Sequence, residues 1–174
     1  FFTRGSEFFF KRPVIEARWD SATRDNRGYF FYSSSLAPAA DNLNTLYLYN
    51  VVRGRLVDIP GIGDGEHIYV SLYSGSKDNT TTSGSALGLS VGGGVTATGH
   101  FNATGSKVST GIYSCSLALT AANDNNTGHY PGTNITKLFD VWHTSSNGTS
   151  IGSTVFHTGA VTPMVLDSSI INPY

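Results

Sequence analysis

The feature of this sequence that most limits its fold is a succession of short alternating segments, joined by turn residues and without any helical pattern. In residues 45–52 two leucines alternate with two tyrosines, and in residues 67–74 Ile68, Val70 and Leu72 share one face. Alternation with a period of two is the pattern of a half-buried strand. About ten such segments occur, at the spacing of an antiparallel sandwich. We therefore predict an all-β, antiparallel β-sandwich, Ig-like or jelly-roll-like, with essentially no helix.

The composition agrees with a folded domain and excludes several functional classes. Of 174 residues, 39% are hydrophobic and 13% are charged, which is too apolar for a disordered chain. A net charge of −1 argues against nucleic-acid binding. No apolar run approaches the ~20 residues that a membrane-spanning helix needs. We therefore expect neither a nucleic acid nor a membrane as partner.

The arginines are unevenly distributed, because all seven lie within the first 55 residues. A basic first part and an acidic second part could help chains to associate head to tail. The favoured alternative is that these cations are scattered along strand edges, where they discourage aggregation.

Turn residues and boundaries divide the chain further. We predict turns at Arg53-Gly54 and at Gly105-Ser106, and two closing strands at 154–158 and 161–166. The chain begins without Met, and residues 1–20 look like the closing strands of an upstream β domain. Residues 21–166 form the predicted sandwich, with a sub-boundary near 59–66, and residues 167–174 form a C-terminal tail.

One short stretch resembles an immunoglobulin-like domain. Residues 110–115 read Thr-Gly-Ile-Tyr-Ser-Cys, which is similar to the G-x-Y-x-C entry to strand F of that fold. The resemblance implies that Tyr113 forms a corner hydrogen bond to the backbone. Cys115 is the only cysteine, so the disulfide of such domains is absent and we expect a buried, structural thiol.

No set of residues predicts a reaction. The G-x-S-x-G match at 148–152 lies in a predicted hairpin, whereas a nucleophile elbow needs a strand-to-helix turn. Asp58, Asp64 and Glu66 surround a glycine-rich loop, but their spacing does not match an EF-hand. We predict no enzymatic activity, no catalytic residue, no metal site and no cofactor.

Four side chains are the candidates for binding: Tyr130, Trp142, His143 and His157. Aromatic side chains on strands and loops can stack on sugar rings, although packing in the core or an interface is the commoner use. His143 and His157 could meet across the closing hairpin, but two histidines without a third ligand make a weak metal site, and cross-strand packing or solvent exposure is the favoured alternative.

Longer phrases resemble virion structural proteins of tailed bacteriophages, particularly marine and cyanobacterial ones. The phrases are residues 11–20, 44–50, 138–143 and 156–159, and the likeness covers most of residues 8–166. The resemblance implies a non-enzymatic component of the neck, tail, baseplate or capsid decoration. Its location would be the virion, and its partners other virion proteins and further copies of itself. The alternative is a carbohydrate-binding or cell-surface adhesion module that recognises a host surface glycan.

Overall fold

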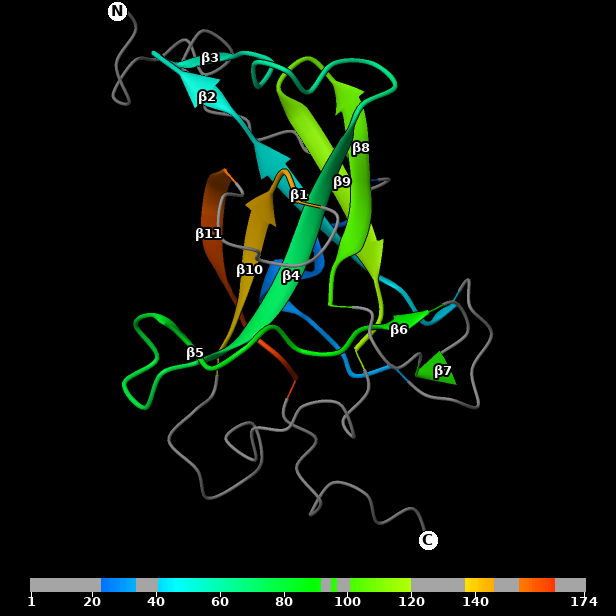
Figure 1. The fold of residues 1–174 in the computed structure, drawn as a ribbon, viewed down its shortest axis with the longest axis vertical. Coiled ribbons are helices and arrows are strands. Elements are labelled where there is room, and N and C mark those ends of the chain that lie inside the picture. The colour runs from blue at the N-terminus through cyan, green and yellow to red at the C-terminus, as the bar shows by residue number, and fades with distance from the viewer. Residues whose placement is uncertain are drawn as a thin grey trace, which may run out of the picture.

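The computed structural model describes residues 23–33, 41–91, 95–96, 101–119, 137–145 and 154–164. Within these residues the protein is all-β, and its only helical element is the short 3-10 turn η2 (Asn26–Gly28). All strand pairs are antiparallel (Figure 1). The predicted fold class is therefore confirmed. The predicted upstream strands of 1–20 and the tail of 167–174 lie outside the described residues.

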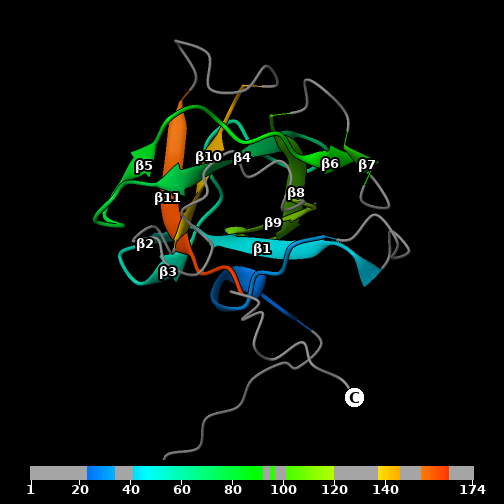
Figure 2. The same cartoon turned by 90° about the horizontal axis from the view of Figure 1, so that it is seen from below.

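One curled sheet forms most of the molecule. Its strands follow one another in the order β1 (Asn44–Tyr49), β9 (Ile112–Leu117), β8 (Ala103–Ser109), β4 (His67–Gly75), β10 (Leu138–His143) and β11 (Val155–Val161). A short strand, β5 (Thr82–Ser83), also pairs with β4. Two small hairpins complete the described strands: β2 (Val51–Val52) with β3 (Arg55–Leu56), and β6 (Ser90–Val91) with β7 (Val95–Thr96). Seen along the strands, the sheet curls so that its halves face each other (Figure 2).

The main hydrophobic core lies inside the curl. Alternation along each strand sends one set of side chains inward, including Leu46, Leu72, Tyr113 and Trp142, none of which is exposed to solvent. A smaller cluster on the outer face joins Tyr73, Phe139 and Val141. The alternation in the sequence thus separates two apolar layers on opposite faces of the same strands.

The curled sheet has two edges, β1 and β11, and the segment 25–33 lies between them. On the β11 side, the backbone N–H of Thr162 donates to the carbonyl of Arg27 at 2.8 Å, and Phe30 forms a parallel bridge with Pro163. On the β1 side, the contacts to the strand come from side chains. We call residues 25–33 the closing segment.

Side chains bind the backbone at the β1 edge. The Oδ1 of Asn26 accepts from the N–H of Thr45 at 2.9 Å, and the Asn44 side chain bonds both the N–H and the carbonyl of Phe31. Open sheet edges attract strands from other chains. Here side chains of the closing segment occupy two backbone groups of the β1 edge, the N–H of Thr45 and the carbonyl of Tyr47.

Two glycines that the sequence predicted to interrupt strands lie inside them. Gly105 is in β8, where a Cβ would lie 2.7 Å from the carbonyl oxygen of Ser114. Gly159 is in β11, where a Cβ would lie 2.7 Å from Oδ1 of Asp140. The predicted turn at 105–106 and the break after 158 are therefore wrong, because both glycines provide space for a neighbour. The β8–β9 turn is at Gly111, with φ of 68°.

Candidate functional site

The four predicted binding residues do not form one site. Tyr130 lies outside the described residues. Trp142 and His143 are both 0% exposed, and their side chains project to opposite faces of β10. His157 is exposed, and it pairs with Trp142 across the hairpin. His143 and His157 do not meet, because His157 pairs with Trp142 and adjacent residues of a strand point to opposite faces. Trp142 cannot stack on a sugar, since it presents no surface to solvent.

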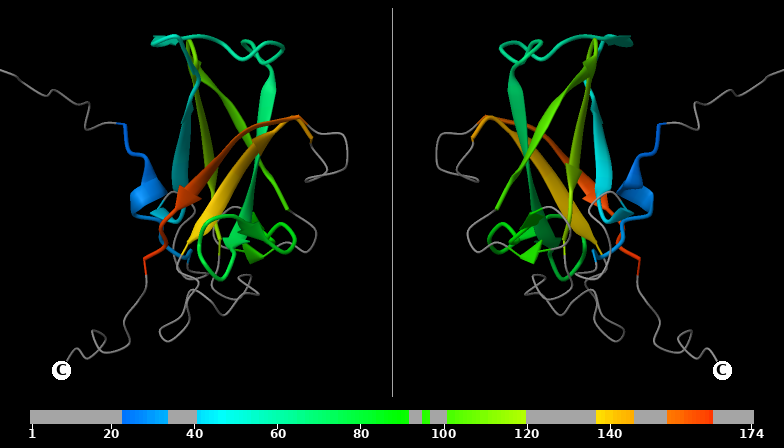
Figure 3. Two further views of the ribbon diagram at one scale, coloured as in Figure 1. Left: turned by 90° about the vertical axis from the view of Figure 1, so that its left-hand side faces the viewer. Right: turned by 90° about the vertical axis from the view of Figure 1, so that its right-hand side faces the viewer.

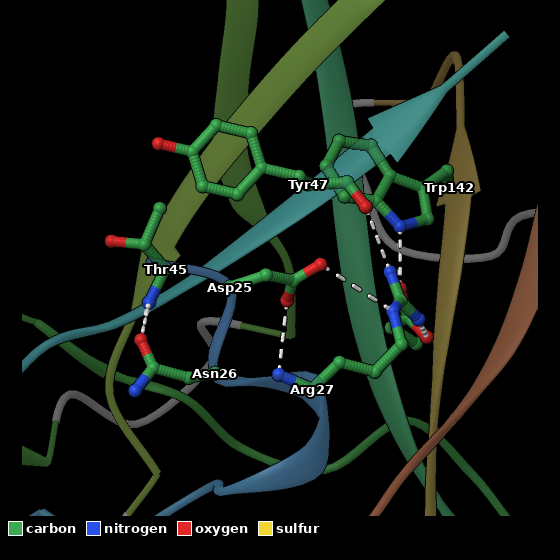
Figure 4. Close-up of polar contacts among 7 residues, drawn as sticks. Asp25, Asn26, Arg27, Thr45, Tyr47 and Trp142 are labelled. Carbon is green, nitrogen blue, oxygen red and sulfur yellow. Dashed lines mark hydrogen bonds and ion pairs between the residues drawn. The ribbon is translucent and has the colours of Figure 1, made fainter. Parts of the chain in front are cut away.

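Trp142 belongs to a buried polar network at the seam between β1 and β11 (Figure 4). Its Nε1 donates to Oδ2 of Asp140 at 2.6 Å, and Asp140 also forms an ion pair with the guanidinium of Arg27. The Nη2 of Arg27 donates to the carbonyl of Tyr47 at 2.9 Å. Asp140 is completely buried, and Arg27 is 25% exposed.

This network holds the seam together and leaves no room for a ligand. One oxygen of Asp140 accepts from Trp142 and the other pairs with Arg27. The backbone of Gly159 lies beside both the Asp140 carboxylate and the Arg27 guanidinium. A methyl group added at Gly159 would overlap Nη1 of Arg27. A buried carboxylate is tolerated when it is paired and hydrogen-bonded in this way. We therefore assign Asp140 and Arg27 a structural role, and the sequence analysis missed both.

Tyr113 anchors a distant loop to the core. Its hydroxyl accepts from the N–H of Ile59 at 2.8 Å and donates to the carbonyl of Ile62 at 3.0 Å. These partners lie 54 and 51 residues upstream, whereas the immunoglobulin-like corner bonds only a few residues away. The hydroxyl thus fixes the 59–62 loop on the sheet.

Cys115 is 2% exposed and burial raises the pKa of its thiol to about 12, so it is a core residue as predicted.

Replacing Tyr113 by Phe is expected to lower the free energy of unfolding by about 1–3 kcal/mol, because two buried backbone groups lose their partner. Urea unfolding followed by tryptophan fluorescence measures the change. Tyr47→Phe, which alters a half-buried tyrosine outside the core, is the control and should change stability little. An unchanged midpoint for Tyr113→Phe would show that water replaces the hydroxyl.

His143 is buried on the outer face of the sheet. Its Nδ1 accepts from the N–H of Ser145 at 3.2 Å, and its Nε2 lies 2.9 Å from the Oγ of Ser71. This arrangement places the proton on Nε2, which donates to Ser71. Burial lowers the pKa of His143 below its ordinary value of 6.5, because the charged imidazolium would lose its hydration.

The lowered pKa predicts a loss of stability in mild acid. Below pH 6.5 the unfolded chain takes up a proton on this histidine and the folded chain does not, so the free energy of unfolding falls as the pH falls from 6.5 towards the folded pKa. His143→Gln is expected to reduce this slope, as measured by urea unfolding at a series of pH values. His67→Gln, at an exposed histidine, is the control. Equal slopes in wild type and His143→Gln would contradict the assignment.

A different feature stands out at one end of the sandwich, where the β2–β3 hairpin lies beside the β8–β9 turn. Among the described residues nine large apolar side chains are exposed, and six of them gather here, with exposed fractions of 41–57%: Tyr49, Val51, Val52, Leu56, Val57 and Val108. The hairpin, the loop that follows it and β8 also carry charged residues: Arg53, Arg55, Asp58, Asp64, Glu66 and Lys107. We call these twelve residues the apical surface. A clustered apolar patch rimmed by polar groups is typical of a protein interaction site.

Hydrogen bonds fix the base of the hairpin on the neighbouring turn. The N–H of Asn50 donates to the carbonyl of Gly111 at 2.8 Å, and its side-chain amide donates to the carbonyl of Val57 at 2.6 Å. The N–H of Gly111 donates in turn to Oδ1 of Asp58 at 2.7 Å. The apical surface is therefore held in one arrangement before any partner binds, which lowers the entropic cost of binding.

Lys107 organises the acidic part of the apical surface. Its Nζ lies 2.8 Å from Oδ2 of Asp58 and 3.0 Å from Oδ1 of Asp64. The hydrogen bond from Lys107, followed by that from the N–H of Gly111, lowers the pKa of Asp58. The two carboxylates therefore bind an ammonium group. No group of three or more potential metal ligands occurs among the described residues.

The sequence did contain a signal for the apical surface. Val51-Val52 and Leu56-Val57 place apolar residues on both faces of a two-residue-turn hairpin, whereas a half-buried hairpin alternates apolar with polar residues. A hairpin that is apolar on both faces has to be covered by something else. The sequence analysis treated it as ordinary strand and turn.

Comparison with known proteins finds no protein-family model, curated protein or solved structure that matches this chain. Within the described residues there is no helix of the length and apolarity needed to cross a membrane.

Proposed function

We propose that this chain is a non-enzymatic structural module of a tailed-phage virion, and that it works by docking to protein neighbours through the apical surface. The observation that carries the docking function is the cluster of six exposed apolar side chains on a hairpin whose base is fixed by hydrogen bonds. Burial of such side chains in an interface supplies the binding free energy. The assignment to a virion rests on the resemblance of residues 11–20, 44–50 and 138–143 to virion structural proteins.

The fold suits such a role. The closing segment occupies the β1 edge with side chains, so that edge is less available for non-specific strand pairing. Docking is thereby directed to the apical surface. This proposed function requires no catalytic residue.

Quantitative mass spectrometry of density-purified phage particles, scaled to the major capsid protein, tests the proposal. We expect peptides of this chain in intact particles. Hundreds of copies would indicate a shell decoration protein, and a few to a few dozen would indicate the neck, tail or baseplate. Absence of the peptides from intact particles would contradict the virion assignment.

One observation favours a second function, carbohydrate binding. Tyr47 and Tyr49 stack along β1 with ring centroids 6.2 Å apart and an interplanar angle of 26°, and Tyr49 is 49% exposed. Paired aromatic rings of this kind can provide a platform for a sugar. A glycan-array signal that is lost in Tyr49→Ala and kept in Tyr29→Ala, an exposed tyrosine outside β1 that serves as the control, would favour this function. Identical signals in both variants would count against it.

A further inference from the structure

The apical surface carries opposite charges on its two sides. The β2–β3 hairpin lies on one side of this end of the molecule and the loop of residues 57–66 crosses to the other, as the two views of Figure 3 show. Arg53 and Arg55 are at the hairpin, and Asp58, Asp64 and Glu66 are in the loop. The exposed valines and leucine lie on and beside the hairpin.

These charges are only partly neutralised by the other residues that the structure describes. Among the described residues, the side chains of Arg53, Arg55 and Glu66 make no ion pair or hydrogen bond. Lys107 is shared by Asp58 and Asp64, and the side chain of Asp64 is still 91% exposed. Within the described ranges, the two arginines on one side and Glu66 on the other thus face outward without a counter-ion, and the Asp64 carboxylate is exposed beside its partner Lys107.

We infer that the apical surface binds a second copy of this chain through a two-fold contact, with Arg53 and Arg55 of each copy facing Asp64 and Glu66 of the other. A two-fold contact uses the same patch on both copies, so the patch must be complementary to itself. Opposite charges on the two sides of an apolar area satisfy this condition. This inference rests on the proposed docking function and names its partner.

The two kinds of side chain have different roles in this dimer. The apolar side chains Val52 and Val57, on the face of the hairpin that also carries Arg55, are covered on association, and their removal from water supplies the affinity. The charges select the orientation, because any other rotation about the contact brings like charges together. Added salt is expected to weaken the dimer, since the charged pairs lie at the exposed rim.

Charge-swap variants of the full 174-residue chain test the inference by sedimentation-velocity ultracentrifugation. We expect wild type to dimerise, and R53E/R55E and D64K/E66K each to dimerise at least about tenfold more weakly, because like charges then meet. An equimolar mixture of the two variants should dimerise again, since both charged contacts are restored in the mixed pair. R24E/K77E, which changes the same number of charges away from the apical surface, should dimerise like wild type.

Three results would overturn the inference: a wild-type chain that stays monomeric up to about 100 µM, a mixture that is no tighter than its components, or weakening by R24E/K77E equal to that by R53E/R55E. Circular dichroism and thermal unfolding of each variant separate loss of contact from loss of fold. Co-sedimentation of a monomeric wild type with phosphatidylglycerol vesicles would assign the surface to an anionic membrane instead. A monomer that is nevertheless found in purified particles would leave the proposed virion function intact and overturn only the dimer.

Discussion

Replacing Arg27 by Met is expected to lower the free energy of unfolding by about 3–5 kcal/mol, the largest effect of any single substitution at the seam. Asp140 is 0% exposed, so removal of its partner leaves a carboxylate without a countercharge and without water. The Nη2 bond to the carbonyl of Tyr47 is lost as well. Urea unfolding followed by tryptophan fluorescence measures the change, and Arg24→Met, at an exposed arginine, should stay within about 0.5 kcal/mol of wild type.

A second variant separates the charge from the packing. In Arg27→Met/Asp140→Asn the carboxylate is replaced by a neutral amide whose oxygen can still accept from Nε1 of Trp142. We expect the double variant to be more stable than Arg27→Met alone, because no uncompensated charge remains. A double variant as unstable as the single one would show that Arg27 acts through packing and its bond to Tyr47.

Replacing Gly111 by Ala is expected to cost about 2–5 kcal/mol, because two unfavourable effects coincide at this position. Its φ of 68° is strained for a residue with a Cβ. The Cβ would lie 2.6 Å from the backbone nitrogen of Val57 and 3.0 Å from the carbonyl carbon of Leu56. Because backbone atoms cannot rotate away, the hairpin has to move, and the apical surface is expected to lose dimerisation together with stability.

Gly54 is a matched control for Gly111. Its φ is 77°, and a Cβ there would meet nothing within 4 Å. Gly54→Ala therefore carries the backbone strain without the overlap, and we expect a cost of about 1 kcal/mol with dimerisation retained. Thermal and urea unfolding of the two variants measure the difference. Equal costs at both positions would show that the close approach of the hairpin to the turn contributes nothing.

The sequence predicted those strands whose alternating pattern can be recognised from neighbouring residues alone. Residues 45–49 and 67–70 alternate because one face of each strand is buried there, and this pattern survives in any antiparallel arrangement. The turn at Arg53-Gly54 was also predicted from its composition. Gly105 and Gly159 were misread as interruptions. A glycine that makes a turn and a glycine that makes room for a neighbour look the same until that neighbour is known.

The buried ion pair and the anchor of Tyr113 could not be predicted for a related reason. Arg27 and Asp140 are 113 residues apart, and nothing in their local sequence distinguishes them from surface charges. Tyr113 was assigned a backbone hydrogen bond by resemblance, but its partners in the 59–62 loop depend on how β9 lies in the sheet. The apical surface differs from both, because its signal is contained in Val51-Val52 and Leu56-Val57. To predict the apical surface from these residues, one has to consider whether both faces of the hairpin can be buried.

The closing segment also sets the order in which the protein can reach its native state. It follows from a separation of 113 residues that Arg27 cannot meet Asp140 until β10 and β11 have formed and joined the sheet. Contacts between such distant residues slow folding, since a long loop must close before any of them forms. On the ribosome, the contacts of the closing segment with β1 span only 13 to 20 residues and can form early, whereas its contacts with β10 and β11 must wait until nearly the whole described chain has been synthesised. Closure of the seam on the β10–β11 side is therefore expected to come late in folding, and until then the closing segment contacts β1 alone.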